Sequence, residues 1–451
     1  MHRIFLHSLS LICLLVFGQS ATVIGQTAMR LADCVQYALD NHPQVQIAKL
    51  QIADADCQIK ENTAIGLPQI SAGIDYQYFI KRPGIPASVF QFGSSGPGAD
   101  SLDDVRIVFS SKHSLSPSIT LQQLLFSNSY LTGLKAARHY RQFVQLQQAV
   151  TQKTLRDQVT DAYLPALLIA ENLLILDKNI ANLEKLLQET QATNQAGFAE
   201  QLDVDRLQLA LSSLRTEREN LARQRDIVVN ILKMAMGMPV KQELSLSDDL
   251  GALMAQYADA DLTAGLNYMN RPEYVALLKG RELRLLQADL YRKPWMPTVA
   301  GFVQYQPGWQ GGFAEGNKWF FIPSAIAGIS VQIPIWDGGA NAARHERAII
   351  AAQAIDAQQQ LLENAFDLEI ETARKQYLNA SERVGSQQQN LELAQRIYNT
   401  TQTKYKAGVG SSFELVSAEQ QLYAAQQALM NAQFDLLTAK VTIRKALGAT
   451  K

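Results

Sequence analysis

The fold is decided by the stretch LELAQRIYNTTQTKYKAGVGSSFELVSAEQQL, residues 391–422, where one very long helical pattern ends and another begins. The first pattern runs from Asn341 to Lys406 without proline, and a helix of that length would measure about 99 Å. The second runs back from the turn at Gly408 to Leu447. Since few compact domains are that wide, the sequence predicts an elongated helical hairpin.

Both limbs of this hairpin carry two apolar rows with a spacing of seven residues. The rows of the outgoing limb are Ile370, Tyr377, Val384, Leu391, Tyr398 and Tyr405 beside Phe366, Ala373, Ala380, Gln387, Ala394 and Thr401. The rows of the return limb are Leu415, Leu422, Leu429, Leu436 and Ile443 beside Ala418, Ala425, Ala432, Ala439 and Ala446. Large side chains that face alanine-sized holes predict closely packed antiparallel helices, with polar residues on the outer faces.

The chain contains this pattern twice. An offset of 211 residues carries residues 196–237 onto 407–448, including the Ala-Gly turn and the last glycine. An offset of 229 residues carries Asn-His-Pro at 41–43 onto Asn-Arg-Pro at 270–272. In the first copy, Arg218 and Arg225 occupy an apolar row, which predicts looser packing. The predicted parts are a first repeat over 26–240, a linker over 241–269 and a second repeat over 270–451.

Each repeat is predicted to contain a helix, two strands around a loop, and the long hairpin. Alternation of apolar and polar residues places the strands at about 69–80, 114–126, 298–306 and 325–336. The first helices cover 44–65 and 273–293, and the hairpins cover about 129–236 and 339–447. The loops 81–113 and 307–323 hold many aromatic residues, among them Trp309 and Trp319. These suit either the aromatic belt of a membrane interface or a hydrophobic loop cluster.

The N-terminal residues 1–25 have the pattern of a secretory signal peptide, with Arg3 before a short apolar run. The rest of the chain has no run of 18 apolar residues, which argues against a transmembrane helix. A formal net charge of −1 gives no reason to expect a nucleic acid partner. Cys34 and Cys57 are either two small buried helix residues or a disulfide formed in an oxidising compartment.

These features resemble the TolC-like outer-membrane efflux proteins over nearly the whole mature chain. The resemblance rests on the duplicated order of elements, the Asn-x-Pro before each first helix and the paired Ala-Gly turns. Its most specific part is IPIWDGG at 333–339, followed by KYKAG at 404–408 and Leu447-Gly448. The first repeat departs from this motif and reads LLFSNS at 124–129.

The resemblance implies a mainly α fold with a small β part, in which long hairpins form an α-barrel and four transmembrane strands per chain form a 12-stranded barrel in a homotrimer. Elementary physics agrees, because four strands cannot close a barrel and lipid tolerates no open strand edge. The implied function is the outer-membrane exit duct of a tripartite efflux or type I secretion system. Its implied partners are outer-membrane lipid, a periplasmic adaptor and an inner-membrane pump.

The resemblance also assigns roles at the helix turns. The expected adaptor-contacting tips are Gly197, Phe198, Ala199, Gly408, Val409 and Gly410. The expected periplasmic gate consists of Asp203, Glu414 and Arg206, in which the acids form a ring of carboxylates and the arginine latches the closed state. The alternative is purely structural: the glycines end helices and the acids stabilise the first turns of the return helices.

The sequence contains no recognisable motif of an enzyme active site. The six histidines lack metal-ligand spacing, a phosphate loop and a nucleophile elbow are missing, and Asp248-Asp249 is expected to be solvated. We therefore predict no cofactor, no metal and no enzymatic activity. The alternative to a channel is a non-pore periplasmic coiled-coil adaptor or scaffold, which would need one hairpin and other small β domains. A wide wet tunnel has little reason to encode its cargo, so the sequence does not identify the transported substrate.

Overall fold

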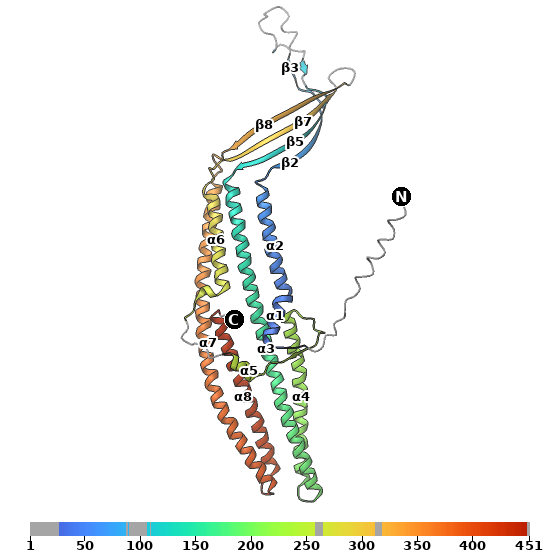
Figure 1. The fold of residues 1–451 in the computed structure, drawn as a ribbon, viewed down its shortest axis with the longest axis vertical. Helices are drawn as coiled ribbons and strands as arrows, with labels where there is room; N and C mark the ends of the chain where they lie inside the picture. The colour runs from blue at the N-terminus through green and yellow to red at the C-terminus, as the bar shows by residue number, and fades with distance from the viewer. Residues whose placement is uncertain are drawn as a thin grey trace, which may run out of the picture. The chain divides into compact units, whose positions relative to one another are not determined.

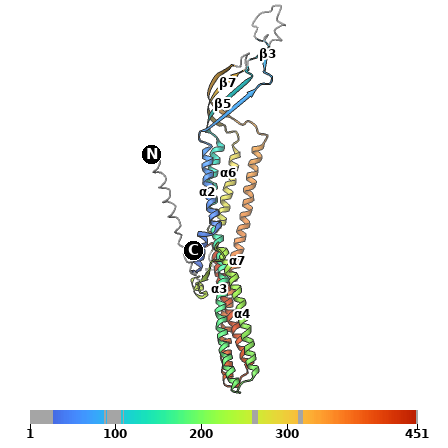
Figure 2. The same ribbon diagram turned by 90° about the vertical axis from the view of Figure 1, so that its right-hand side faces the viewer.

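The computed structural model describes residues 27–86, 89, 106–108, 110–257, 265–311 and 318–448. The predicted signal peptide, residues 1–25, lies outside them. The chain forms two compact units, each built from segments that are distant in sequence (Figures 1 and 2). The helical unit comprises Met1–Ala48, Gln148–Pro272 and Leu362–Lys451, and the sheet unit comprises Lys49–Gln147 and Glu273–Leu361.

Two long antiparallel hairpins make up most of the helical unit, as the sequence predicts, and the first residues of their outgoing helices belong to the sheet unit. The hairpins are α3 (Asn128–Gln195) with α4 (Gln201–Met236), and α7 (Ala340–Lys406) with α8 (Ser412–Ala446). The four helices lie side by side, and both hairpin turns lie at the same end (Figure 1). At that end, one apolar cluster draws on all four helices, with Leu183, Leu207 and Leu415 at its centre.

The heptad rows form the seam. All five large side chains of the predicted α8 row are buried, and so are four of its five alanines; Ala425 is half-buried. The prediction of uniformly polar outer faces is wrong for α7, because several large apolar side chains lie exposed outside the seam. They are Leu361 and Leu368 together with Leu378, Leu393 and Ile397.

The first hairpin is packed less completely. The buried residues of α4 lie in its first and last turns, between Val204 and Leu211 and between Leu232 and Met236. In the middle, Arg218 pairs with Asp177 of α3 at 2.6 Å on an exposed face. The arginines on the apolar row therefore correspond to a stretch of α4 that is not buried within this chain.

A small equatorial region in the helical unit was not resolved by the sequence patterns, which showed only a linker at 241–269. It contains β1 (Thr27–Met29), α1 (Leu31–Asn41), β6 (Leu244–Leu246), α5 (Leu250–Gln256) and a 3₁₀ turn, η3 (Tyr268–Asn270). β1 and β6 pair in parallel. Around them, Cys34, Tyr163 and Met236 are fully buried in one apolar core. This core joins the N-terminal segment to α3, α4 and α8.

A four-stranded antiparallel sheet dominates the sheet unit, in the order β2-β5-β7-β8 (Figure 1). Its strands are β2 (Gln69–Tyr78), β5 (His113–Phe126), β7 (Thr298–Gly311) and β8 (Trp319–Gln332). The helices α2 (Pro43–Ala64) and α6 (Pro272–Arg292) match the predicted first helices within one residue. A short hairpin of β3 (Gly84–Pro86) and β4 (Arg106–Val108) falls within the predicted loop 81–113.

The strands of the second repeat differ from the prediction. β7 continues to Gly311 and β8 begins at Trp319, so most of the predicted loop 307–323 is strand. β8 also ends at Gln332, which leaves Ile333 and Ile335 outside the strand. The prediction placed the strand ends too early because it assigned the aromatic residues to the loop. In the structure, Trp309 and Phe321 instead form a cross-strand pair with ring centroids 5.1 Å apart.

Cys34 and Cys57, the two cysteines of the described residues, are both free. Cys34 is buried, and burial raises the pKa of its thiol to about 12, which keeps it protonated and unreactive. Cys57 is exposed rather than buried. Among the described residues, one helix is long and apolar enough by composition to cross a membrane, namely α3, in a window that is 56% buried inside the chain. Its apolar residues pack in the helical clusters, which explains their hydropathy.

Candidate functional site

The two hairpin turns have the same backbone geometry. Gly197 and Gly408 adopt φ of 80° and 73°, the left-handed conformation that ends a helix. The N–H of Phe198 donates to the Thr193 carbonyl at 3.0 Å, and the equivalent bond runs from Val409 to Lys404 at 3.1 Å. The repeat thus preserves the turn, and it presents an apolar side chain to solvent in each copy. Phe198 is 86% exposed and Val409 is 77% exposed.

The other two predicted tip residues are less exposed. The Ala199 carbonyl accepts a hydrogen bond from the Asn194 side chain at 2.8 Å. At Gly410, a Cβ atom would lie 3.0 Å from the backbone nitrogen of Tyr405, so this residue is close against the end of α7. Both positions are half-buried. The exposed surface of the tips therefore consists mainly of Phe198 and Val409, with the two αL glycines beside them.

Ser412 joins the predicted gate residues of the first hairpin to the second hairpin. Its side chain is buried at the start of α8, where its hydroxyl donates to the Asp203 carboxylate. Arg206 donates to the same hydroxyl at 3.4 Å, and its guanidinium lies over the Phe413 ring at 5.8 Å from the centroid. Asp203 and Arg206 thus contact α8 through one serine. The sequence patterns did not single out Ser412, which is a small polar residue next to a turn.

Glu414 lies in the first turn of α8 and is exposed. Its backbone N–H donates to the Ser411 side chain at 3.2 Å, which makes Ser411 the N-cap of the helix. Asp203 occupies the equivalent first turn of α4, but its carboxylate is committed to Ser412. The two acids of the repeat are therefore not in equivalent surroundings, because one is bonded between helices and the other faces solvent.

At the opposite end of each return helix, the duplicated motifs meet. Gly237 ends α4 in the αL conformation, and a Cβ there would lie 3.0 Å from the ring of His42. Gly448 follows α8 in the same conformation, and a Cβ there would lie 3.0 Å from the Asn270 carbonyl. In the second repeat, Arg271 also donates to the Ala446 carbonyl at 2.9 Å. Each Asn-x-Pro motif thus packs against the glycine at the end of the return helix of its own repeat, and in the second repeat Arg271 also caps that helix.

The carboxylates of the linker have structural partners. The side chain of Asp248 accepts from the backbone N–H of Leu31 and from the Tyr163 hydroxyl, both at 2.8 Å. Asp249 caps α5 by accepting from the Ala252 N–H at 2.9 Å. The expectation that this acidic pair is solvated is therefore wrong for Asp248. Burial and the bond to Asp248 raise the pKa of the Tyr163 hydroxyl.

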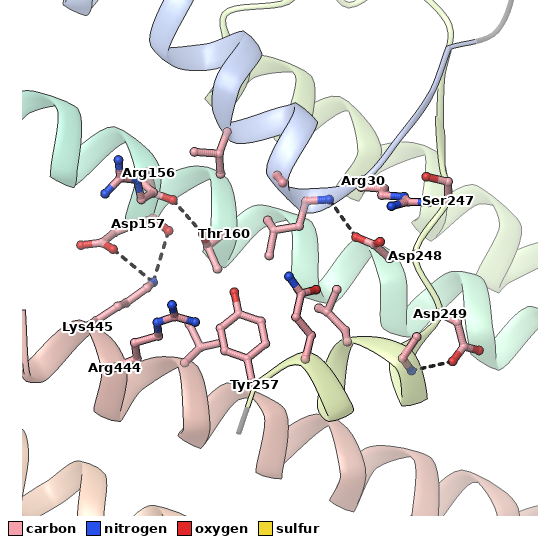
Figure 3. Close-up of a pocket in the computed structure, with 17 residues that line it drawn as sticks. Arg30, Arg156, Asp157, Thr160, Ser247, Asp248, Asp249, Tyr257, Arg444 and Lys445 are labelled. Carbon is pink, nitrogen blue, oxygen red and sulfur yellow. Dashed lines mark hydrogen bonds and ion pairs between the residues drawn. The ribbon is translucent and has the colours of Figure 1, made fainter. Parts of the chain in front are cut away.

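A polar pocket of about 660 Å³ opens beside this acidic pair, between α1, α3, α5 and the end of α8 (Figure 3). Lys445 donates to the Asp161 carboxylate at 2.6 Å and to the Asp157 carbonyl at 3.3 Å. The guanidinium of Arg444 lies over the Tyr257 ring at 5.4 Å from its centroid. The lysine and the arginine thus already contact groups of the chain, so the pocket is part of the equatorial packing.

The sheet has one apolar face and an opposite face that is polar on β2 and over most of β5 but also carries Phe302, Ile322 and Ile326 on β7 and β8. The pairing register places Ile70, Leu121 and Val303 on one face, next to one another on successive strands. Gln122 and Thr120 share the other face with Ser71 and other polar residues of β2. All residues of β2 are exposed within this chain. An amphipathic sheet of this kind suits lipid on one side and water on the other.

Aromatic residues cross the loop end of the apolar face. The register aligns Tyr76 with Leu115, Trp309 and Phe321, and it aligns Tyr78 with His113, Gly311 and Trp319. The Tyr76 hydroxyl lies 2.9 Å from Nδ1 of His113. Polar-tipped aromatic rings in such rows are the arrangement expected at a membrane interface. The sequence identified these aromatics and offered the belt as one of two explanations.

An amphipathic sheet, whose edge strands have no further partner in the described part of the chain, and long polar helical hairpins together define the class of outer-membrane channels that carry a periplasmic helical domain. The sequence model of the outer membrane efflux protein family matches residues 34–238 and 269–449, and this chain belongs to that family. It is therefore an efflux channel of the outer membrane, with its helical hairpins in the periplasm.

Relatives of known role span most of the chain. The toluene efflux pump outer membrane protein TtgC of Pseudomonas putida is 23% identical over 93% of this chain and 82% of its own length. The pyoverdine export outer membrane protein OpmQ of Pseudomonas aeruginosa is 25% identical over 93% of this chain and 85% of its own length.

Solved structures share the fold. The outer membrane protein VceC of Vibrio cholerae matches with a TM-score of 0.67 at 15% identity, covering 93% of this chain and 96% of VceC. The channel protein CusC matches with a TM-score of 0.70 at 17% identity, covering 94% and 92%. The alternative of a non-pore periplasmic adaptor has no support from these matches, since both repeats and their strands belong to a channel family.

Proposed function

We propose that three copies of this chain assemble into one exit duct, in which their sheets close a 12-stranded barrel and their six hairpins form a periplasmic tunnel. The observation that carries this proposal is the sheet itself. β2 and β8 are its edges, and neither has a second strand partner among the described residues. Because unpaired backbone groups are costly in lipid, such edges require strands from other copies. Three copies supply a strand number within the range of known barrels.

The helices give independent support. α7 exposes Leu368, Leu378 and Leu393 outside its seam, and α4 exposes Leu209 and Ile227. Apolar surface spread along both hairpins is what subunit contacts would cover. Contacts between subunits of the proposed duct would explain why these residues are apolar although they are exposed in the single chain.

The partners belong to the same proposal. Family membership supports a tripartite system, in which the exposed Phe198 and Val409 at the hairpin tips contact a periplasmic adaptor that links the duct to an inner-membrane pump. Glu414, with Asp203 and Arg206 at the Ser412 junction, forms the periplasmic gate in this proposal. Two relatives are named for toluene efflux and pyoverdine export, but the sheet and helices of this chain carry no feature that selects between such cargoes.

The test of the trimeric barrel uses neighbouring residues of β8 that point to opposite faces. Ile329 is 70% exposed on the apolar face, whereas Ser330 follows it on the polar face. Ile329→Arg should prevent insertion, because an arginine at the lipid midplane costs about 2 to 4 kcal/mol in each of three chains. Ser330→Arg, the matched control, should insert normally because it points into the lumen. Ile74 of β2 and Val303 of β7 share the apolar face, and arginine there should act as Ile329→Arg does.

The measurement is the amount of heat-modifiable trimer in purified outer membranes, together with conductance in planar bilayers. Equal insertion of the two β8 variants would contradict the assigned faces. A stable water-soluble monomer with intact strands would contradict the duct as a whole.

A further inference from the structure

Glu419 is a buried carboxyl group between the helices near the hairpin turns, five residues beyond Glu414 on α8. It is only 6% exposed, and its Oε2 atom has no hydrogen-bond partner in the described part of the chain. Uncharged side chains would be expected at such a position, because burial of an unpaired carboxylate is strongly unfavourable. The position therefore requires an explanation other than packing.

The surroundings of Glu419 leave room for movement. A cavity of about 70 Å³ adjoins it between α3, α4 and α8, with Leu183, Ala210 and Val416 among its walls. This volume is far below that of a typical small-molecule site, so it does not suit a cargo or cofactor. It lies beside the apolar cluster that holds the turn ends of both hairpins together. A change at Glu419 thus acts on the contact between the two hairpins.

The charged groups around this site do not neutralise Glu419. On α3 and α4, Asp177 pairs with Arg218 and Glu184 pairs with Arg215, on exposed faces. Tyr398 of α7 interacts with Glu419 and with Glu189 of α3, and Glu189 also pairs with Lys406 at 3.8 Å. Tyr423 of α8 interacts with Glu217 of α4. Burial raises the pKa of both tyrosines, so they stay neutral near pH 7.

We propose that Glu419 is a proton-operated switch of the packing between α8 and the first hairpin. In its neutral form it is accommodated between the helices and holds the turn end of α8 against α3 and α4. When it ionises, the packed arrangement is disfavoured and the first turns of α8, which carry Ser412 and Glu414, are released. Where the proposed duct is correct, its periplasmic end would tighten in acid and loosen toward neutral and alkaline pH.

The direction follows from linkage. Burial raises the pKa of Glu419 from an ordinary 4.5 to about 7 in the packed state. The packed state therefore binds the proton more tightly than a state in which Glu419 meets water. Its stability is fully present below pH 4.5 and is lost as the pH rises to about 7. With these two values, the ratio of loosened to packed bundle rises about 70-fold between pH 5 and pH 8.

Histidine does not offer a competing explanation in the part of the helical unit that surrounds Glu419, since residues 148–272 and 362–451 contain none. His42, at the opposite end of α4, is the one described histidine of the helical unit. Burial lowers the pKa of His42, and its response would survive substitution of Glu419. A comparison of proteins with and without the carboxyl therefore isolates the switch.

The experiment uses the full-length protein in detergent and compares it with Glu419→Gln, which has nearly the same shape but cannot ionise. Hydrogen exchange of residues 412–423 is followed by mass spectrometry at pH 5 and pH 8, with residues 429–443 of the same helix as internal reference. The two proteins are compared at equal pH, so intrinsic exchange rates cancel. Glu392→Gln, an exposed acid on α7, serves as the matched control, and Glu419→Met provides a second uncharged variant.

We expect the native protein and Glu392→Gln to lose protection in residues 412–423 by tens of fold between pH 5 and pH 8, relative to both Glu419 variants. Equal protection of native protein and Glu419→Gln at pH 8 would overturn the proposal. Conductance in planar bilayers separates this question from the duct. If exchange responds as expected but no conducting channel forms, the switch stands and the proposed function fails. If channels form but both Glu419 variants keep the native exchange profile, the proposed function stands and the switch fails.

Discussion

Arg271 is the residue for which the structure gives the sharpest expectation of instability. Its side chain is 5% exposed and donates to the Lys445 and Ala446 carbonyls at 3.2 and 2.9 Å, which satisfies the end of α8. It also pairs with Glu369 at 3.1 Å and lies over the Phe366 ring at 4.1 Å from the centroid. Removal of one partner from such a buried charged network costs about 3 to 5 kcal/mol. Arg271→Met should therefore lower the free energy of unfolding by about that amount.

The internal duplication supplies the control. His42 stands at the equivalent position of the first repeat, where its Nδ1 accepts one hydrogen bond, from the Gln44 N–H at 3.1 Å. His42→Met should cost only about 1 kcal/mol. Arg271→Lys should fall between the two, because lysine keeps the charge but cannot hold two carbonyls and a carboxylate in one plane. Denaturant unfolding at fixed protein concentration, followed by helical circular dichroism in detergent, measures all three. A loss below 1 kcal/mol for Arg271→Met, or equal losses at the two positions, would refute this reasoning.

Two further predictions concern the hairpin tips and the gate. Phe198→Asp combined with Val409→Asp should abolish export and adaptor binding while the trimer still forms, because both side chains are exposed; unchanged pull-down of the adaptor would leave the tips with a structural role only. Asp203→Ala combined with Glu414→Ala should reduce cation preference in planar bilayers, and Arg206→Ala should raise the open fraction by releasing Ser412. Unaltered selectivity and gating would show that these residues serve only as structural contacts at the helix ends.

The helical part of the fold could be predicted because its determinants are periodic. The alanine row of α8 and the large row beside it are readable at seven-residue intervals, and they are buried as that spacing requires. The duplication also revealed which positions matter at the helix ends. It aligned Gly237 with Gly448 and His42 with Arg271. Only the structure shows that Gly237 contacts His42 and that Gly448 contacts Arg271. Offsets compare positions along the chain, and they carry no information about which aligned positions touch.

The features that sequence reasoning missed are those in which the local composition suggests a different structure or burial from the one observed. Trp309 and Phe321 look like loop residues beside glycine and proline, whereas their cross-strand contact keeps β7 and β8 paired to their ends. Glu419 reads as a solvated residue in a polar run, and its burial depends on the approach of α3 and α4. The equatorial elements are short, and their pairing joins residues more than 200 positions apart, as in the bond from Leu31 to Asp248.

The two repeats expose different strand edges and different apolar helix surfaces, and this difference bears on how copies of the chain would assemble. The sheet ends in β2 on one side and β8 on the other, so its free edges come from different repeats. The exposed apolar helix surfaces also come from different repeats, since those of α4 belong to the first hairpin and those of α7 to the second. Unlike surfaces of this kind join head to tail, and head-to-tail contacts close into a ring when the rotation per subunit divides a full turn. The chain is thus suited to cyclic closure, which three copies would achieve in the proposed barrel without an open edge.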